Sequence, residues 1–501
     1  MVRDARDPER MSARLKSERG NHFVQGGAPV AMAYPSPYRA GMSSLGYQWI
    51  LHLLREAGIS AERVFLPDDV AEKERSRAPL CSYENRTPLG DFPVIGVSLA
   101  YELELAGLLQ VLRMSGIPPL REQRGPSHPR ILLGGPLTFS NPLPAAPFVD
   151  AMLLGEADEQ VVPAFTGALE LERDAWLNLI ETCPGGYVPE RHGSTLPPVA
   201  RASDRLLPAF APILAPEAEL SDMFLLEGER GCHRMCTFCV MRRSTNGGMR
   251  LVMPERVLDL IPDHARRVGL VGAAISDHPQ LVQILEQLVA SGREVGVSSL
   301  RADRVARRPD IARLLHEGGY RTLTVASDAA SERLRKDILK RTSEEHLSSC
   351  AQLAAEHGFR VLKVYMMLGL PGETDEDIDE LVRFTRELAD IHPVALGIAP
   401  FVPKRNTPLD TADFAGIPIL ERRLKKLRRG LKGRAEVRPT STRWAWVEAR
   451  LAQGGPLAGQ AVWDAVQAGG RFADYRRALE AIPVTDRSTW HASGDTLPNP
   501  A

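Results

Sequence analysis

Residues 223–240 read MFLLEGERGCHRMCTFCV, and the interpretation of the rest of the chain depends on this stretch. The apolar run MFLL predicts a buried strand, and the segment after it holds Cys232, Cys236 and Cys239. These three are half of the six cysteines in a chain of 501 residues. Six cysteines are too few for a disulfide framework in so long a chain, so their clustering favours a metal site.

The alternation of strand and helix continues beyond the cysteines. We expect strands, each followed by a helix, at 223–231, 269–277, 294–302, 321–329, 361–372 and 395–403. Six such units predict a partial (β/α)6 barrel over residues 222–415, because a complete barrel has eight. Barrel active sites lie at the carboxyl ends of the strands, which is where the three cysteines fall.

A second alternating region precedes the barrel. Its expected strands lie at 28–35, 93–100, 130–136 and 151–159. Strands that alternate with helices predict a doubly wound, Rossmann-like α/β domain, which binds ligands at the carboxyl ends of its strands. The expected organisation is a polar arm at 1–27, the Rossmann-like domain at 28–190, a proline-rich linker at 191–221, the barrel at 222–415 and a helical C-terminal region at 416–501.

The composition excludes several classes of protein. The chain is 44% hydrophobic and 25% charged, with a formal net charge of -1, so it points to no polyanion or membrane partner. No apolar run reaches the roughly 18 residues that a membrane span needs. The start of the chain is charged and lacks the apolar stretch of a secretory signal. We therefore expect a cytoplasmic protein.

The spacing C-x3-C-x2-C can direct three thiolates at one inorganic centre. A [4Fe–4S] cluster usually takes four cysteines, so three would leave one iron open for a substrate or cofactor. Catalytic metal sites keep such an open position. The other interpretation is a zinc site with His233 as the fourth ligand. His233 adjoins Cys232, however, and zinc motifs usually consist of two separated pairs.

With the aromatic Phe238 before the last cysteine, the motif resembles the signature of the radical S-adenosylmethionine (SAM) superfamily. The resemblance covers about residues 220–410. It implies an enzyme in which Cys232, Cys236 and Cys239 hold a [4Fe–4S] cluster while SAM chelates the fourth iron. Reduction of the cluster would cleave SAM to methionine and a 5′-deoxyadenosyl radical that abstracts hydrogen from the substrate. It also implies an electron donor such as flavodoxin or ferredoxin.

Later strand ends resemble the SAM-binding segments of the same superfamily. The loop GAAISDHP (272–279) corresponds to the one that receives the amino group of the methionine moiety, although it lacks the usual Gly-Gly-Glu. Asp328 stands where relatives more often carry Glu. The resemblance assigns no catalytic residue beyond the cluster ligands. The cofactor-binding residues that it implies in the barrel are Phe238, Gly272, Ser276, Ser299, Arg301, Ser327, Asp328 and Gly369.

The front region resembles the Rossmann-type domain that precedes the barrel in the cobalamin-dependent class. Ser98, Gly134 and Gly135 correspond to its Ser-x-Leu and Gly-Gly loops, so cobalamin is a possible second cofactor. The first loop, SPYRAGMSSLG (36–46), lacks the Asp-x-His-x-x-Gly whose histidine binds cobalt. With cobalamin, the implied reaction is methyl transfer to an unactivated carbon. Without it, the implied reaction is a rearrangement or modification started by the 5′-deoxyadenosyl radical, and the domain would only support the barrel or contact the substrate.

The rival class is a non-catalytic iron–sulfur or zinc protein that senses redox state or binds RNA. The segment LERRLKKLRRGLKGR (420–434) predicts an amphipathic helix with a basic face, and that face is the sequence's main argument for RNA. Cys350 shares a predicted helix face with Leu347 and Ala354, so we expect it in the core. The sequence leaves the substrate open between a small molecule, a peptide and RNA.

Overall fold

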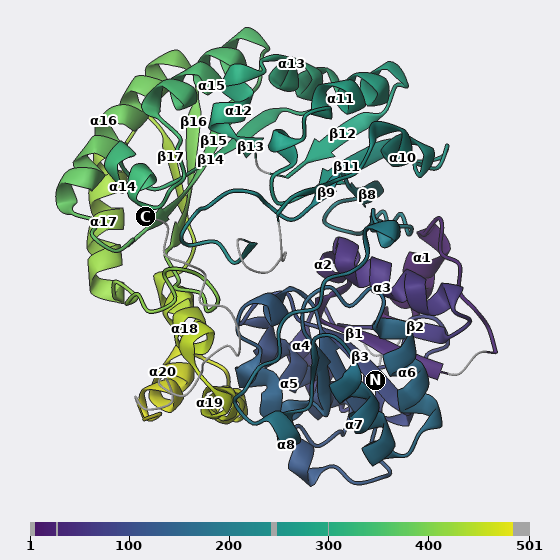
Figure 1. The fold of residues 1–501 in the computed structure, drawn as a ribbon. Helices are drawn as coiled ribbons and strands as arrows, with labels where there is room; N and C mark the ends of the chain where they lie inside the picture. Colours follow the sequence, from purple (N-terminus) through teal and green to yellow (C-terminus); the bar gives the residue numbers. More distant parts are fainter. Residues whose placement is uncertain (1–5, 27–28, 242–247, 299, 484–501) are drawn as a thin grey trace. The chain divides into compact units, whose positions relative to one another are not determined.

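The computed structural model describes residues 6–26, 29–241, 248–298 and 300–483. The chain divides into two compact units, of which the first combines residues 1–222 with 450–501 and the second comprises residues 223–449 (Figure 1). Of the predicted site residues, Ser299 lies outside the described residues. Within the described ranges, the helices lack the combination of length and apolar character needed to cross a membrane.

The first unit contains one sheet of strand order β2-β1-β3-β4-β5-β6. All neighbouring strands are parallel except β5 and β6. The strands are β1 (Pro29–Pro37), β2 (Ser60–Leu66), β3 (Val94–Ser98), β4 (Arg130–Gly134), β5 (Ala151–Leu153) and β6 (Gly186–Tyr187). The order 2-1-3-4-5 is a doubly wound arrangement whose ligand crevice lies between β1 and β3. The predicted Rossmann-like fold is therefore confirmed.

Two groups of helices pack against this sheet. The helices are α1 (Arg6–Ser17), α2 (Tyr38–Gly41), α3 (Leu45–Glu56), α4 (Val70–Ser76), α5 (Glu104–Met114), α6 (Val161–Glu170), α7 (Arg173–Thr182), α8 (Pro189–His192), α19 (Pro456–Gln467) and α20 (Phe472–Glu480). In one group α3 contacts α6, which contacts α7, and in the other α5 contacts α19. The C-terminal residues thus belong to the first unit.

The return of the C-terminal residues to the first unit differs from the single helical region that the sequence predicts at 416–501. The amide of Asn141 donates to the backbone oxygens of Leu451, Ala452 and Gly454, at 3.1, 3.1 and 2.7 Å, and so satisfies carbonyl groups at the end of α18 (Thr442–Gln453). Helix α19 packs on α5 and on the 3-10 turn at Leu143–Phe148. Residues 416–449 remain with the barrel.

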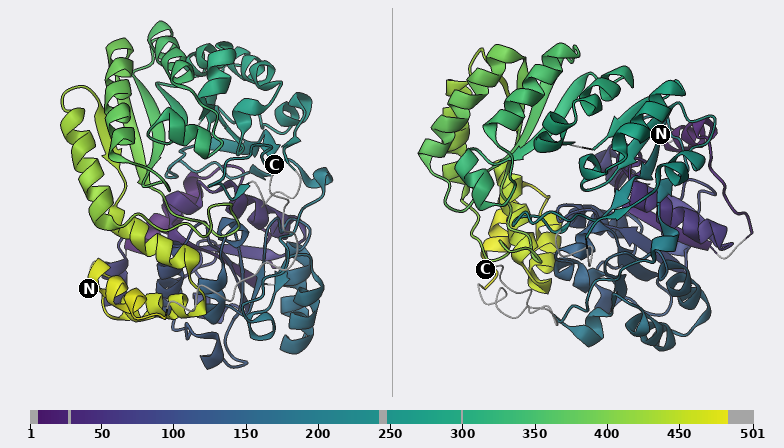
Figure 2. Two further views of the ribbon diagram at one scale, coloured as in Figure 1. Left: turned by 60° about the vertical axis from the view of Figure 1, so that its left-hand side comes forward. Right: turned by 45° about the horizontal axis from the view of Figure 1, so that its top comes forward.

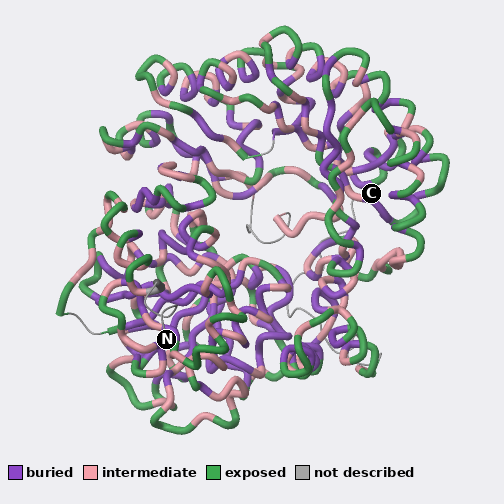
Figure 3. The backbone as a smooth tube through the Cα atoms, turned by 180° about the vertical axis from the view of Figure 1, so that it is seen from behind, coloured by how far each residue is buried: buried purple, intermediate pink, exposed green. Residues whose placement is uncertain are grey.

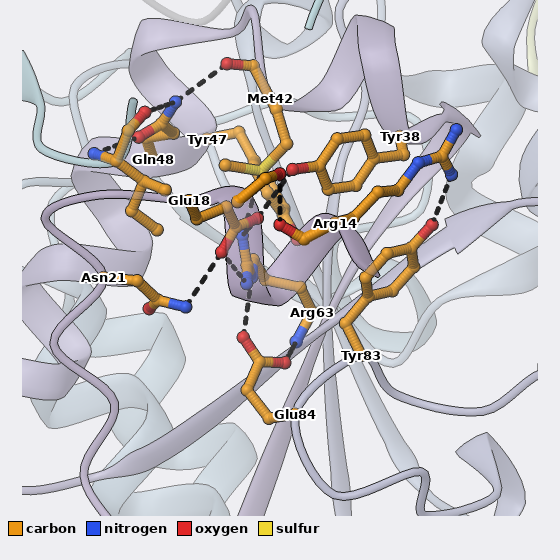
Figure 4. A network of polar contacts seen from close by, with 12 residues as sticks. Arg14, Glu18, Asn21, Tyr38, Met42, Tyr47, Gln48, Arg63, Tyr83 and Glu84 are labelled. Carbon is orange, nitrogen blue, oxygen red and sulfur yellow. Dashed lines mark hydrogen bonds and ion pairs between the residues drawn. The ribbon is translucent and has the colours of Figure 1, made fainter. Parts of the chain in front are cut away.

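The polar arm expected at 1–27 is also more ordered than the sequence suggested, because a buried ion network fixes it (Figure 4). Arg63 on β2 donates twice to the Glu18 carboxylate at 2.8 Å and once to Glu84 at 2.6 Å. The side chains of Arg63 and Glu18 are 0% exposed. Arg55 adds a hydrogen bond of 2.7 Å to Glu84. Charged residues of the arm therefore take part in buried ion pairs.

The segment expected as a linker at 191–221 lies along the first unit. The backbone NH of Ala200 donates to Leu154 O at 2.8 Å, and that of Ile213 donates to the side chain of Gln48 at 2.9 Å. Several of the segment's apolar residues are buried, among them Ala200, Ala211 and Leu214. Its proline content indicated irregular backbone correctly, but the irregular backbone is packed.

The parallel strands of the second unit form two parts, which are separate sheets by their hydrogen bonding. One part has the order β12-β11-β8, and the other has the order β13-β14-β15-β16-β17. The strands are β8 (Met223–Glu227), β11 (Arg267–Val271), β12 (Glu294–Val297), β13 (Leu300–Arg301), β14 (Thr322–Asp328), β15 (Val361–Leu368), β16 (Val394–Pro400) and β17 (Glu436–Pro439). The six predicted strands of the partial barrel are confirmed, with β12 and β13 following each other where one was expected. Strand β17 was missed.

Helices line one side of these strands (Figure 2). They are α10 (Pro254–Asp259), α11 (Leu281–Ala290), α12 (Ala302–Arg307), α13 (Asp310–Glu317), α14 (Glu332–Asp337), α15 (Glu344–Glu356), α16 (Asp375–Ile391) and α17 (Ile417–Gly430). Buried residues concentrate along the strands (Figure 3), but β14 and β15 alternate, so only one of their faces is fully buried. Helix α15 packs on β15, and Tyr365 of β15 is 40% exposed. The other face of these strands therefore leaves side chains accessible.

The basic segment at 420–434 forms α17 and the turn after it, with Leu420, Leu424, Leu427 and Leu431 buried. The amphipathic prediction is confirmed. Part of the basic face is neutralised within the unit, because Arg423 pairs with Glu373 and Lys426 pairs with Asp379, both at 2.7 Å. RNA binding by this helix stays a prediction.

The buried network of the first unit gives a stability prediction. Arg63→Met leaves Glu18 and Glu84 buried with fewer partners, so we expect the free energy of unfolding of this unit to fall by about 3–5 kcal/mol. The matched control is Arg113→Met, which removes a half-exposed ion pair with Glu74 and should cost less than about 1 kcal/mol. Urea unfolding followed by circular dichroism measures both. Equal losses would show that the arm is not held by this network.

Candidate active site

The three cysteines lie in a loop that follows the first strand of the partial barrel. We call residues 231–241 the cysteine loop. It leaves β9 (Glu229–Arg230), which forms an antiparallel pair with β10 (Arg250–Leu251). Gly231 has φ +96°, a conformation that favours glycine and lets the chain turn before Cys232. The loop therefore starts at the carboxyl end of β8, as the sequence predicted.

The thiols are shielded from water and near one another. Cys236 is buried, and Cys232 and Cys239 are half-buried. Burial raises the pKa of Cys232, and it raises the pKa of Cys239 to about 11, with smaller contributions from the other two thiols. Thiolates are the form that binds metal, so a cationic centre is needed to displace these protons.

The surroundings of the thiols and of His233 bear on the zinc interpretation. Among the residues that the structure describes, no three His, Cys, Asp or Glu side chains are grouped so as to hold a metal ion. His233, the fourth ligand of the zinc interpretation, has its ring nitrogen 3.7 Å from the Asp277 carboxylate. The structure therefore gives His233 a partner other than a metal ion.

Asp277 fixes one side of the cysteine loop. Its side chain is fully buried and accepts two hydrogen bonds from Arg234 of the loop, at 2.6 and 2.7 Å. Arg304 of α12 binds the same carboxylate. Burial alone would raise the pKa of Asp277, but the two guanidinium groups outweigh it and hold that pKa below its usual value. A forked Arg–carboxylate contact fixes orientation as well as distance.

Residues 338–341 contact the other side of the loop. The backbone NH of Thr237 donates to Ile338 O at 3.1 Å, and the Cys236 sulfur lies 3.9 Å from Leu339 O. Leu339 and Arg341 have φ of +56° and +58°. Such conformations cost side-chain-bearing residues about 1–3 kcal/mol each, and they concentrate at functional sites.

Two of the predicted cofactor-binding residues contact the segment 338–341. Asp328 has φ +63° and forms an ion pair with Lys340. Arg301 donates to Lys340 O at 2.7 Å and to Asp303 at 2.9 Å. Ser276 accepts a hydrogen bond of 3.2 Å from the Arg301 backbone NH. The structure thus links Ser276, Arg301 and Asp328 to the surroundings of the cysteine loop.

The remaining barrel predictions are placed differently. Ser327 is buried on the opposite face of β14 from its neighbour Asp328, and its hydroxyl contacts Ala329 O and Arg335. Gly369 has φ +89°, and a Cβ there would lie 2.8 Å from Leu420 Cδ2, so helix packing accounts for this glycine. Phe238 is half-buried within the cysteine loop. Gly272 lies against the Glu229 carboxylate.

Glu229 is a residue that the sequence interpretation missed. It is three positions before Cys232, it is 1% exposed, and burial raises its pKa to about 7. The EGERG segment showed two acidic residues before the cysteines, but only the structure distinguishes them. Glu227 pairs with Arg230 at 2.8 Å, whereas Glu229 turns inward. Arg234 and Asp277, described above, were also missed.

The predicted residues of the first unit lie at the ends of β3 and β4. Ser98 and Gly134 are in register, and Leu99 NH donates to Gly134 O at 3.0 Å. Gly135 has φ +99°, and a Cβ there would lie 2.6 Å from Leu99 O. The close Leu99 backbone therefore accounts for the glycine at position 135. The loop after β1 offers no imidazole, since residues 36–46 contain no histidine.

Cys350 is fully buried, and its sulfur lies 3.6 Å from Ala302 O, which confirms the core position predicted for it.

Two family models match the chain in sequence order. The model described as "Radical SAM proteins, N-terminal" matches residues 46–189, and the model of the radical SAM superfamily matches residues 228–385. The second match includes the cysteine loop. An uncharacterized protein of Methanocaldococcus jannaschii is 27% identical over 410 residues, which cover 79% of this chain and 83% of that protein.

Two solved structures share the fold. TsrM from Kitasatospora setae, a radical SAM methyltransferase with tryptophan and a SAM analogue bound, gives a TM-score of 0.53 at 13% identity over 76% of this chain and 75% of TsrM. OxsB, a cobalamin-dependent SAM radical enzyme with aqua-cobalamin and SAM bound, gives 0.52 at 15% identity over 83% of this chain and 58% of OxsB. At these identities the likeness establishes the fold alone.

Asp277→Asn tests the anchoring of the cysteine loop. The amide cannot accept both arms of Arg234, so we expect the reconstituted protein to lose iron to a chelator about 10-fold faster than the wild type. Asp310→Asn is the control, because Asp310 only pairs with Arg313 on the surface. The rate is followed by absorbance of the iron–chelator complex. Equal rates in the two variants would contradict the anchoring role.

Proposed function

Because the chain belongs to the radical SAM superfamily, we propose that it is an enzyme that binds a [4Fe–4S] cluster through Cys232, Cys236 and Cys239 and cleaves SAM reductively. The observation that carries this proposal is the cysteine loop itself. Three shielded thiols lie at the carboxyl end of the first barrel strand, between the anchors at Asp277 and at residues 338–341. An electron donor such as flavodoxin or ferredoxin would reduce the cluster.

The family uses the cluster and SAM to supply an electron and a carbon radical, and the protein's own residues hold the site in place. Arg234 and Asp277 orient the loop that carries the thiols, and burial keeps water from them. Arg301 and Lys340 place positive charge beside Asp328 and the loop. Radical chemistry needs such shielding, because solvent would quench a reactive intermediate.

The accessible face of β15 gives the barrel room for a substrate. Tyr365 is exposed there, and the Lys363 ammonium lies 2.9 Å from its hydroxyl and 4.6 Å from its ring centroid. Gly397 on β16 leaves space for the Tyr365 ring, because a Cβ there would lie 2.8 Å from Tyr365 Cδ1. We propose that these two side chains contact the substrate.

The finer proposal is that the first unit binds cobalamin and that the reaction is methyl transfer to an unactivated carbon. The doubly wound order 2-1-3-4-5 and the glycine turn at Gly134 and Gly135 support it, together with the fold shared with OxsB. Because the loop after β1 contains no histidine, it would supply no imidazole ligand for the cobalt.

Product analysis tests the enzymatic proposal. The anaerobically reconstituted and reduced protein should convert SAM to 5′-deoxyadenosine or S-adenosylhomocysteine, detected by mass spectrometry. Cys232→Ala should lose iron and both products, because one cluster ligand is gone. Cys350→Ala should keep the iron, because Cys350 is a core residue outside the cysteine loop. If the iron-loaded wild type formed neither product, the result would favour a non-catalytic iron–sulfur protein instead.

Corrinoid retention tests the finer proposal. The protein purified with hydroxocobalamin should keep a corrinoid absorbance spectrum after gel filtration. Gly135→Val should lower the amount retained, because φ +99° and the Leu99 backbone exclude a β-branched side chain. Gly125→Val, at a position with open space, is the matched control. No spectrum in the wild type would restrict the reaction to chemistry of the 5′-deoxyadenosyl radical.

A further inference from the structure

A cavity of about 300 Å³ lies in the first unit, between α1 of the N-terminal arm and the carboxyl end of β2. We call it the arm pocket. All of its lining residues lie between Pro8 and Arg86, so it is distinct from the loops after β3 and β4 to which cobalamin is assigned above. Its volume is at the lower end of the range for small-molecule sites. The arm pocket therefore has the size of a site for a small ligand of its own.

The inner walls of the arm pocket are mostly apolar. The apolar side chains that line it come from α1, from β2 and from the segment after α4, and they include Met11, Phe65, Leu66 and Leu80. The Cys81 thiol lies in the same wall, and burial raises the pKa of that thiol, so it carries no charge near neutral pH. A ligand that fills this space needs an apolar body.

The charged side chains around the arm pocket are mostly cationic. The cations are Arg10, Arg14, Lys73 and Arg86, and Asp68 is the one carboxylate among the described residues that line it. Arg10 and Arg14 both pair with Asp68, at 2.7 and 3.0 Å, and Arg14 also pairs with Glu217 at 2.9 Å. The two carboxylates thus neutralise two of the four cations. The charge of Lys73 acts on the Cys81 thiol and opposes the rise in its pKa, so a positive field reaches the wall of the pocket.

Arg86 is the cation best placed to bind an anionic group. Its guanidinium donates one hydrogen bond, of 2.9 Å, to the backbone oxygen of Pro8. Within the described part of the chain, no carboxylate pairs with it, and its side chain is exposed. A guanidinium has five N–H donors in a planar fork that matches the oxygens of a carboxylate or a phosphate. Arg86 therefore keeps donors for an anion at the edge of the apolar cavity.

We propose that the arm pocket binds a small molecule with an apolar body and a carboxylate or phosphate group, and that Arg86 binds the anionic group. The apolar body would lie against Phe65 and Leu80. This site goes beyond the proposed function, because it involves neither the cluster nor SAM. Since Met11 and Arg14 belong to the arm, the ligand would also stabilise the arm against β2.

Alkylation of Cys81 measures whether the arm pocket is occupied. The full-length protein is treated with iodoacetamide, and the rates at Cys81 and Cys183 are followed by mass spectrometry of their peptides. Cys183 is the internal control, because it is also half-buried and burial alone raises its pKa. The probes share one ring and differ in charge: benzoate, phenyl phosphate, benzyl alcohol and benzylamine.

At saturation, benzoate or phenyl phosphate should slow alkylation of Cys81 at least about 5-fold, because a pocket buries most of its ligand, and should leave Cys183 unchanged. The more effective of the two anions identifies the preferred acidic group. Benzyl alcohol and benzylamine at the same concentration should leave both rates unchanged. The inference is overturned if neither anion protects Cys81, or if benzylamine protects it as well as the anions do.

Variants test the role of Arg86. Arg86→Gln should raise the anion concentration that gives half protection about 5-fold, because a charged hydrogen bond is lost, and Arg86→Lys should restore part of the effect. Arg75→Gln is the matched control, because Arg75 is an exposed cation of α4 that lies outside the lining of the arm pocket. It should behave as the wild type does. Equal protection of Arg86→Gln and wild type would contradict the assignment of Arg86.

Discussion

The contact between Asp277 and Arg234 is the interaction on which the candidate site depends. Arg234 sits between Cys232 and Cys236, and Asp277 follows β11, so the contact ties the loop after one strand to the loop after its neighbour. Parallel strands make this possible, because their carboxyl ends meet at one edge of the sheet. Arg304 extends the tie to α12. Without it, the glycine-led cysteine loop would depend on its contacts with residues 338–341 for its orientation.

Backbone strain complements this tie on the other side of the loop. Asp328, Leu339 and Arg341 all have positive φ, and all lie beside or one residue from the Lys340 contact. None of them is glycine, so the conformation is imposed by the surroundings. Bonds from Arg301 to Lys340 O and from Thr237 to Ile338 O hold the segment in this shape. The site is therefore built from stiff parts, as expected where a cluster and a reactive cofactor must keep fixed positions.

The sequence predicted those features that depend on neighbours along the chain. The barrel strands are apolar runs of ordinary length, and the cysteine loop is a local motif, so both could be recognised. Strand β2 was not predicted because Glu62 and Arg63 interrupt its apolar pattern. Arg63 pairs with Glu18, which lies 45 residues away in the sequence. Strand β17 has four residues, two of them charged, and is defined by pairing with β16. Ser327 and Asp328 show the same limit, because adjacent residues point to opposite faces of a strand.

The electron paramagnetic resonance spectrum of the reduced protein, recorded before and after addition of SAM, tests the central claim most directly. Three cysteine ligands and one open iron predict a [4Fe–4S] signal that appears on reduction and changes when SAM is added. A cluster signal that SAM leaves unchanged, or a protein that binds zinc and gives no signal, would contradict the account.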